Sequence, residues 1–143
     1  MDKINEIYAY FRLSGVDLDP DEITAKVGIE PTQTWKTGDL VIRPKGRRVT
    51  RKFSLWEVKS KLDPLGELDP TQVLDLHVES VFEQLEPGWE SLVKICRDYD
   101  ALICGVVYAY TDMPAICLTK ENIKKIGELN AGIDIDVYAR IKE

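Results

Sequence analysis

Apolar and polar residues alternate at both ends of the chain, and a period of two predicts half-buried β-strands. The first alternating run covers residues 7–13 and stops at Gly15, and the second covers residues 133–141. Residues 53–58 and 101–110 are apolar on both sides, which is typical of strands inside a sheet. The hydrophobic pattern therefore predicts four main strands.

A period near 3.6 with capping residues predicts helices between these strands. Asp19, followed by proline, is a strong helix start, and Gly28 is a natural end. Asp69 repeats this device before a longer apolar stripe that reaches residue 85. Further helices are predicted over residues 89–96 and after Thr119.

The order of elements predicts a single α+β domain over residues 1–143. A short strand at residues 116–118 completes the order β-α-β, α-α, β-β-α-β, which favours a ferredoxin-like fold. Its sheet would be antiparallel or mixed, with the helices on one face. Prolines and glycines punctuate residues 29–52, which we expect to form a long irregular loop that carries a basic hairpin.

Charge is distributed unevenly over the 143 residues, whose net charge is −6. Six of the 19 lysine and arginine residues fall within positions 43–52, so the remainder is more acidic than the total indicates. This balance disfavours general nucleic-acid binding. With Lys36, the predicted basic loop consists of Lys36, Arg43, Lys45, Arg47, Arg48, Arg51 and Lys52. It either lies in solvent and pairs with acidic residues of the same chain, or it docks an acidic partner.

The cysteines and the N-terminus predict a cytoplasmic protein. Cys96, Cys104 and Cys117 form no Cys-x-x-Cys pair and lie in apolar segments, as reduced core thiols do. Four charged residues among the first twelve are incompatible with a secretory signal. No stretch has the ~20 apolar residues of a membrane span.

Several segments together form one pattern: the stretch from Gly15 to Thr24, residues 28–32, Gly38 with Asp39, Trp56, and residues 133–138. This pattern resembles that of a bacterial family known as domain of unknown function 4279. The resemblance covers nearly the whole chain and implies a compact α+β fold. It brings no established activity and no catalytic residue. Trp35, Gly38 and Asp39 lie in this family-like region, and we expect them to anchor the loop, with Trp35 capping the core.

Aromatic residues recur on the predicted strands. Tyr8 and Tyr10 have the same spacing as Tyr108 and Tyr110, so two adjacent strands would bring four tyrosines to the face without helices. We predict a partner surface formed by Tyr8, Tyr10, Trp56, Tyr108, Tyr110, Asp134, Asp136 and Tyr138. Aromatic residues with carboxylates favour a protein partner or a homodimer over RNA. The alternative is that the helices or residues 29–51 cover this face.

No constellation predicts catalysis, a metal or a cofactor. His77 is the only histidine and lies on an apolar helix face, where we expect a neighbour to satisfy it. A catalytic role would require a hydroxyl or carboxylate within about 3.2 Å of its ring, in a deep pocket. Asp134 and Asp136 share one face of a strand, but no third acidic ligand is fixed beside them.

The sequence thus predicts a non-enzymatic protein-interaction module that acts through an aromatic–acidic sheet face and a basic loop. An immunity-type protein that neutralises a toxin is one version. The alternative is a small-molecule-binding or regulatory domain with a pocket between the sheet and the loop. A hydrolase or transferase and an RNA-binding protein follow in that order.

Overall fold

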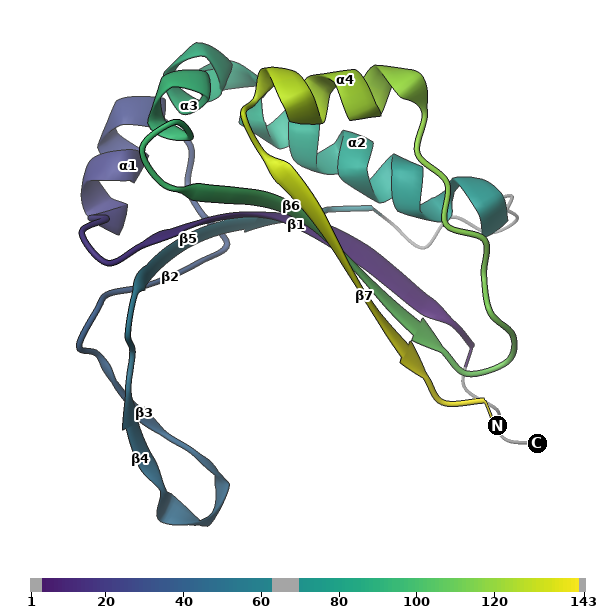
Figure 1. The fold of residues 1–143 in the computed structure, drawn as a ribbon, viewed down its shortest axis with the longest axis horizontal. Helices are drawn as coiled ribbons and strands as arrows, with labels where there is room; N and C mark the ends of the chain where they lie inside the picture. The colour runs from purple at the N-terminus through teal and green to yellow at the C-terminus, as the bar shows by residue number, and fades with distance from the viewer. Residues whose placement is uncertain (1–3, 63–69, 142–143) are drawn as a thin grey trace.

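A computed structural model describes residues 4–62 and 70–141 of the chain. Helices lie along one face of a curved sheet, and a separate two-stranded hairpin projects from the other side (Figure 1). In chain order the elements are β1 (Glu6–Gly15), α1 (Pro20–Val27), β2 (Gln33–Trp35), β3 (Leu40–Ile42), β4 (Arg48–Thr50), β5 (Ser54–Lys59), α2 (Val73–Leu85), α3 (Trp89–Ile95), β6 (Asp100–Ala109), α4 (Lys120–Glu128) and β7 (Gly132–Ala139).

The main sheet is mixed and has the order β2-β5-β1-β6-β7. β1 pairs antiparallel with both β5 and β6, whereas β6 and β7 are parallel. The predicted α+β class and the helices on one face are confirmed, and the ferredoxin-like topology is not. Repeated strand–helix–strand patterns do not specify which strands become neighbours. Here α4 forms part of the crossover that a parallel pair requires.

The predicted strand at residues 116–118 is wrong, because residues 113–119 have no regular secondary structure. Its apolar residues belong to the crossover, and β7 takes the position beside β6. Residues 29–52 contain β2, β3 and β4, so Trp35 lies in a strand at the sheet edge instead of a loop. Three residues without a clear period were too short a signal to predict β2.

Helix capping follows the sequence closely at α1. The Asp19 side chain accepts a hydrogen bond from the Asp21 N–H, Pro20 occupies the first turn, and Gly28 ends the helix in the left-handed region with φ 70°. Thr119 caps α4 in the same way by accepting from the Asn122 N–H. The second predicted cap, Asp69, lies outside the described residues.

The hydrophobic core lies between the helices and one face of the sheet. β1 contributes Ala9, Phe11 and Leu13, all fully buried, and α2 covers them with a stripe that includes Val78 and Val81. β5 contributes Trp56 and Val58, and β6 contributes Ile103. The alternate residues of these strands point to the opposite face, which the helices leave uncovered (Figure 1).

Candidate functional site

The face of the sheet opposite the helices is here called the open face. The strand register and the alternation of side chains place five of the six tyrosines on it. The aromatic rings contact one another along β1 and between β6 and β7. Tyr108 stacks on Tyr138 with ring centroids 4.9 Å apart, and its centroid lies 6.3 Å from that of Tyr110. Tyr8 and Tyr10 have centroids 6.4 Å apart. The structure therefore brings together the tyrosines that the sequence analysis selected.

The tyrosines cover small apolar residues of the open face. Cys104 and Val106 are buried, with Cys104 only 2% exposed, yet both lie outside the core cluster beneath the helices. They pair in register with Tyr10 and Tyr8. Burial, with a smaller contribution from the Cys104 thiol, raises the pKa of Tyr10 well above its usual value. Burial likewise raises the pKa of Cys104 to about 11, so this thiol is not a reactive nucleophile at neutral pH.

Charges on the open face are arranged from one edge to the other. β7 contributes Asp134 and Asp136 at one edge, in register with Cys104 and Val106. On the other side of β1, the Lys59 ammonium lies 4.1 Å from the centre of the Tyr8 ring. The tyrosines therefore lie between the aspartates of β7 and Lys59 of β5, and Glu6 and Glu57 also lie close enough to act on Tyr8.

The end of the open face near β2 is covered by its own side chains. The Arg51 guanidinium lies 3.6 Å from the centre of the Trp35 ring, whose indole N–H donates to the Phe53 carbonyl oxygen at 3.0 Å. Trp35 pairs in register with Leu55, which is buried. Trp35 thus covers the open face rather than the core cluster, which it does not join.

Arg12 is a further residue of this end that the sequence analysis missed. It pairs in register with Glu57, and its guanidinium carbon lies 5.4 Å from the centre of the Phe53 ring. Its buried Nε has no hydrogen-bond partner among the described residues. Burial raises the pKa of Glu57 despite the opposing charges of Arg12 and Lys59. The alternation of Arg12 with Phe11 and Leu13 was the signal that placed it on the open face.

Trp56 does not belong to this surface, so its assignment to the predicted partner surface is wrong. It is 0% exposed and lies in the core cluster beneath the helices. Its ring meets Phe11 edge-on at 6.1 Å, and its indole N–H donates to Thr24 Oγ1 at 3.0 Å. Phe53 and Leu55 suggested that both faces of β5 are apolar. The signal that was missed is the alternation of Glu57 and Lys59 with Trp56 and Val58.

The basic loop forms the β3–β4 hairpin, which projects on the side of the sheet opposite the helices (Figure 1). Leu40 and Ile42 are 57% and 67% exposed, which is unusual for large apolar residues. The sequence analysis considered only the basic residues of this hairpin. No ion pair or side-chain hydrogen bond to another described residue is formed by Arg43, Lys45, Arg47, Arg48 or Lys52. The hairpin therefore presents apolar and positively charged side chains together.

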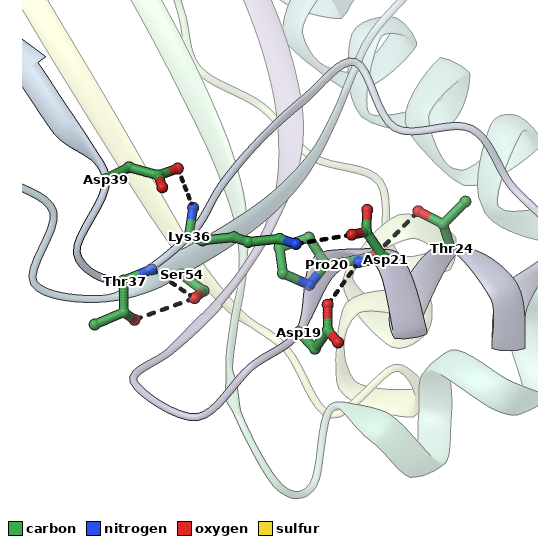
Figure 2. A network of polar contacts seen from close by, with 8 residues as sticks. All are labelled: Asp19, Pro20, Asp21, Thr24, Lys36, Thr37, Asp39 and Ser54. Atoms are coloured by element: carbon green, nitrogen blue, oxygen red, sulfur yellow. Dashed lines mark hydrogen bonds and ion pairs between the residues drawn. The ribbon is translucent and has the colours of Figure 1, made fainter.

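Lys36 differs from the hairpin residues because it belongs to a structural network (Figure 2). Its ammonium binds the Asp21 carboxylate at 2.8 Å, and its N–H donates to Asp39 Oδ2 at 2.8 Å. Gly38 has φ 90° and donates its N–H to the Arg51 carbonyl. Thr37 N–H donates to Ser54 Oγ at 2.9 Å. Lys36 and Thr37 thus join the root of the hairpin to α1 and β5, and Gly38 and Asp39 hold the root itself together.

His77 lies close to a hydroxyl group. The His77 Nδ1 and Ser60 Oγ atoms are 2.8 Å apart, and Ser60 Oγ also accepts from the Ala9 N–H at 3.2 Å. Burial and, to a lesser extent, Lys59 lower the pKa of His77, which favours a neutral ring. The distance meets the geometric condition for a nucleophile–base pair. However, both short contacts of Ser60 Oγ lie within the fold, and the pair joins α2 to the sheet.

A cleft of about 350 Å³ lies between α2 and α4 and is lined by residues that include Asp75, Glu79, Glu121 and Lys125. Asp75 accepts hydrogen bonds from Thr119 and Asn122, so its carboxylate holds the start of α4 in place. His77 does not line this cleft. Within residues 4–62 and 70–141, no group of three or more histidine, cysteine, aspartate or glutamate side chains is placed to hold a metal ion.

No helix among the described residues is long and apolar enough to cross a membrane. The chain belongs to the family described as Domain of unknown function (DUF4279), whose model matches residues 5–140. No curated protein and no solved structure matches the chain. The segments that carry this family's pattern are largely those that hold α1, the hairpin root and β5 together, and the open face lies beside them.

Proposed function

We propose that this member of a family of unknown function is a non-catalytic binding protein that takes a protein partner on its open face. One observation carries the proposal: five tyrosines lie together on the sheet face that the helices leave uncovered. Tyrosine is among the residues that dominate the energetics of protein interfaces, because its ring is large and its hydroxyl tolerates water. Tyr138, at 41% exposed, is the most accessible of the rings near the acidic edge.

The charge arrangement favours a protein over a nucleic acid. Nucleobases stack on aromatic side chains, but phosphates beside Tyr108 and Tyr138 would meet Asp134 and Asp136. A protein partner can place basic side chains against this edge and acidic side chains against the hairpin. The hairpin cations, which have no ion-pair partner among the described residues, remain available for that contact.

We place this activity in the cytosol, where the free thiols of Cys96, Cys104 and Cys117 would stay reduced. Neutralisation of a toxin is the version of this function in which the partner is a harmful enzyme of the same cell or a neighbour. In that version the open face would block the partner's active site.

A photo-crosslinking amino acid at Tyr8 tests the proposal first, because this position lies inside the sheet and away from both edges. The matched control places the same amino acid at Glu83, an exposed residue of α2. Crosslinking to a discrete partner is expected at position 8 and not at position 83. Crosslinking from position 83 alone would contradict the proposal.

Affinity measurements with the purified partner complete this test. Tyr8→Ala and Tyr108→Ala are each expected to raise Kd about tenfold or more, as central interface aromatics do. Glu83→Ala should leave Kd unchanged. If all three variants bind like the wild type, the open face is not the binding surface.

The hairpin has its own readout. Exposed charges at an interface rim mainly affect association rates and their dependence on salt. The double variant Arg47→Ala/Arg48→Ala should therefore slow association at low salt and change the dissociation rate little. Tight, salt-sensitive binding of RNA that this variant abolishes would instead favour the nucleic-acid alternative.

A further inference from the structure

The outer edge of β7 is a long strand edge that no other described strand covers. β7 is the last strand in the sheet order, and its backbone pairs only with β6. The Arg140 N–H donates to the Ala109 carbonyl oxygen at 2.7 Å, so the backbone of Arg140 faces β6. Because backbone groups alternate in direction along a strand, those of Ile133, Ile135 and Val137 face outward.

Apolar side chains accompany this edge on the helix side of the sheet. Ile133 and Val137 are 45% and 39% exposed, and Ile141 is also exposed. Ile123 of α4 is exposed as well. It lies two residues from Lys125, which faces α2 across the cleft, and thus roughly 200° around the helix from it. Ile123 therefore lies on the flank of α4 that points away from α2, towards the free edge.

Uncovered edges of this kind normally carry features that prevent pairing, such as lysine, proline or a bulge. The stretch from Ile133 to Ile141 contains neither lysine nor proline. Within it, residues 133–139 pair with β6 one by one, without a bulge. Its charged residues are two aspartates near the start and Arg140 near the end. Opposite charges at the two ends of a strand are complementary when that strand meets a copy of itself in the antiparallel direction.

We propose that the partner of this edge is a second copy of the chain, with the two β7 strands antiparallel about a two-fold axis at Val137. This register pairs the whole stretch 133–141 with itself. It places each Asp134 opposite Arg140 of the second copy, and each Asp136 opposite Tyr138 of the second copy. Opposite charges across an antiparallel pair stabilise it, and like charges destabilise it.

The backbone and the apolar residues agree with the same register. The outward-facing residues then oppose one another as hydrogen-bonded pairs: Val137 with Val137, and Ile135 with Ala139. Ile133 lies opposite Ile141 of the second copy, so the two exposed isoleucines cover each other. If the axis lies at Ile135 instead, Asp134 of one copy faces Asp136 of the other. If it lies at Asp136, the Asp136 residues of the two copies face each other. Charge repulsion therefore disfavours both shifted registers.

The dimer is isologous and closed, since each copy uses the same edge. The two five-stranded sheets become one continuous sheet, with both helix layers on one side and both open faces on the other. The open faces stay accessible, so dimer formation and partner binding on the open face can be measured separately.

Sedimentation over a wide range of protein concentration tests the dimer. We expect reversible formation of a species with twice the 16.3 kDa mass of one chain. Asp134→Arg and Arg140→Asp should each raise the dimer Kd about tenfold, because both symmetry-related pairs become repulsive. The double variant Asp134→Arg/Arg140→Asp restores opposite charges and should restore dimer formation. Asp98→Arg, an exposed acidic residue after α3, is the control and should have no effect.

Amide hydrogen exchange gives a second readout. In the dimer the N–H groups of residues 135, 137 and 139 should be protected. Val137→Pro removes the central donor at a solvent-facing position, so in this variant the N–H groups of residues 135 and 139 should exchange quickly. A chain that stays monomeric at all concentrations would overturn the proposal. So would a dimer that the single charge variants do not weaken or the double variant does not restore.

Discussion

The two faces of the main sheet are formed by the same strands but are covered differently. On the helix side, Phe11, Leu13 and Trp56 are fully buried under the helices, and the Trp56 indole N–H is paired with Thr24 inside the fold. On the open face, Cys104 and Val106 are buried without a helix over them, and they pair in register with Tyr10 and Tyr8. Helices cover the helix side of the sheet, whereas a layer of tyrosine rings lies on the open face.

This difference separates stability from binding. A residue under the helices contacts many others, so its loss leaves a cavity that the structure cannot fill. A tyrosine of the open face contacts a few neighbours and solvent, so replacing it changes the free energy of unfolding little. The comparison predicts that substitutions on the helix side reduce the free energy of unfolding, and that those on the open face mainly reduce affinity.

The largest expected effect comes from Trp56→Ala compared with Tyr138→Ala. Trp56 loses its packing on Phe11 and its hydrogen bond to Thr24, so the free energy of unfolding should fall by about 3–5 kcal/mol. Tyr138 loses its stacking on Tyr108 and should cost about 1 kcal/mol. Urea unfolding measures both. Equal losses would show that the two faces contribute alike.

Thr24→Val is the next largest change. Valine keeps the shape of threonine but removes the oxygen that accepts from the Trp56 indole N–H, which would then be buried without a partner. We expect a loss of about 1–3 kcal/mol. Thr50→Val, on the exposed hairpin, is the matched control and should change stability by less than about 0.5 kcal/mol. An unchanged midpoint for Thr24→Val would mean that this bond contributes nothing to the core.

Acidification should weaken the contact between His77 and Ser60. The pKa of His77 is lower in the folded chain than its ordinary 6.5, so the unfolded chain binds this proton more readily. The contribution of neutral His77 to the free energy of unfolding is therefore fully present above pH 6.5. It is lost as the pH falls from 6.5 through the lowered pKa of His77 in the folded chain. His77→Gln should remove this part of the pH dependence. The raised pKa of Glu57 has the opposite effect, since it adds stability as the pH falls. Glu57 is present in both the wild type and His77→Gln, so the difference between their pH profiles reports on His77.

Thiol labelling gives the smallest but most local effect. In a Cys117→Ser background, Cys96 and Cys104 should both react slowly, since burial raises their pKa values to about 12 and about 11. Tyr10→Ala should speed the labelling of Cys104 and leave Cys96 unchanged, because only Cys104 lies beside this ring. Equal acceleration of both thiols would indicate general unfolding instead.

Local sequence patterns predicted much of this fold. The alternation in residues 7–13 gave the correct faces of β1, and Asp19 with Gly28 gave the limits of α1. Strand order was not predictable in this way, because it depends on long-range pairing such as that of β6 with β7. The strand predicted at residues 116–118 shows that a short apolar run does not by itself make a strand, since these residues belong to the crossover before α4.

The candidate site was predictable to a similar extent. Equal spacing placed Tyr8, Tyr10, Tyr108 and Tyr110 on one face, since β1 and β6 are adjacent. Trp56 was misplaced because Leu55 suggested a strand with two apolar faces, although Glu57 and Lys59 alternate with Trp56 and Val58. The contacts of Arg12 with Phe53, and of Lys59 with the Tyr8 ring, depend on register and side-chain direction. A pattern in one strand contains neither.

Hydroxyl-radical footprinting of the free protein and of its complex with the crosslinked partner tests the central claim most directly. The account predicts that the complex protects Tyr8, Tyr108 and Tyr138 on the open face and leaves the exposed residues of α2 and α3 as reactive as before. Protection confined to the helix layer, with the tyrosines unchanged, would contradict it.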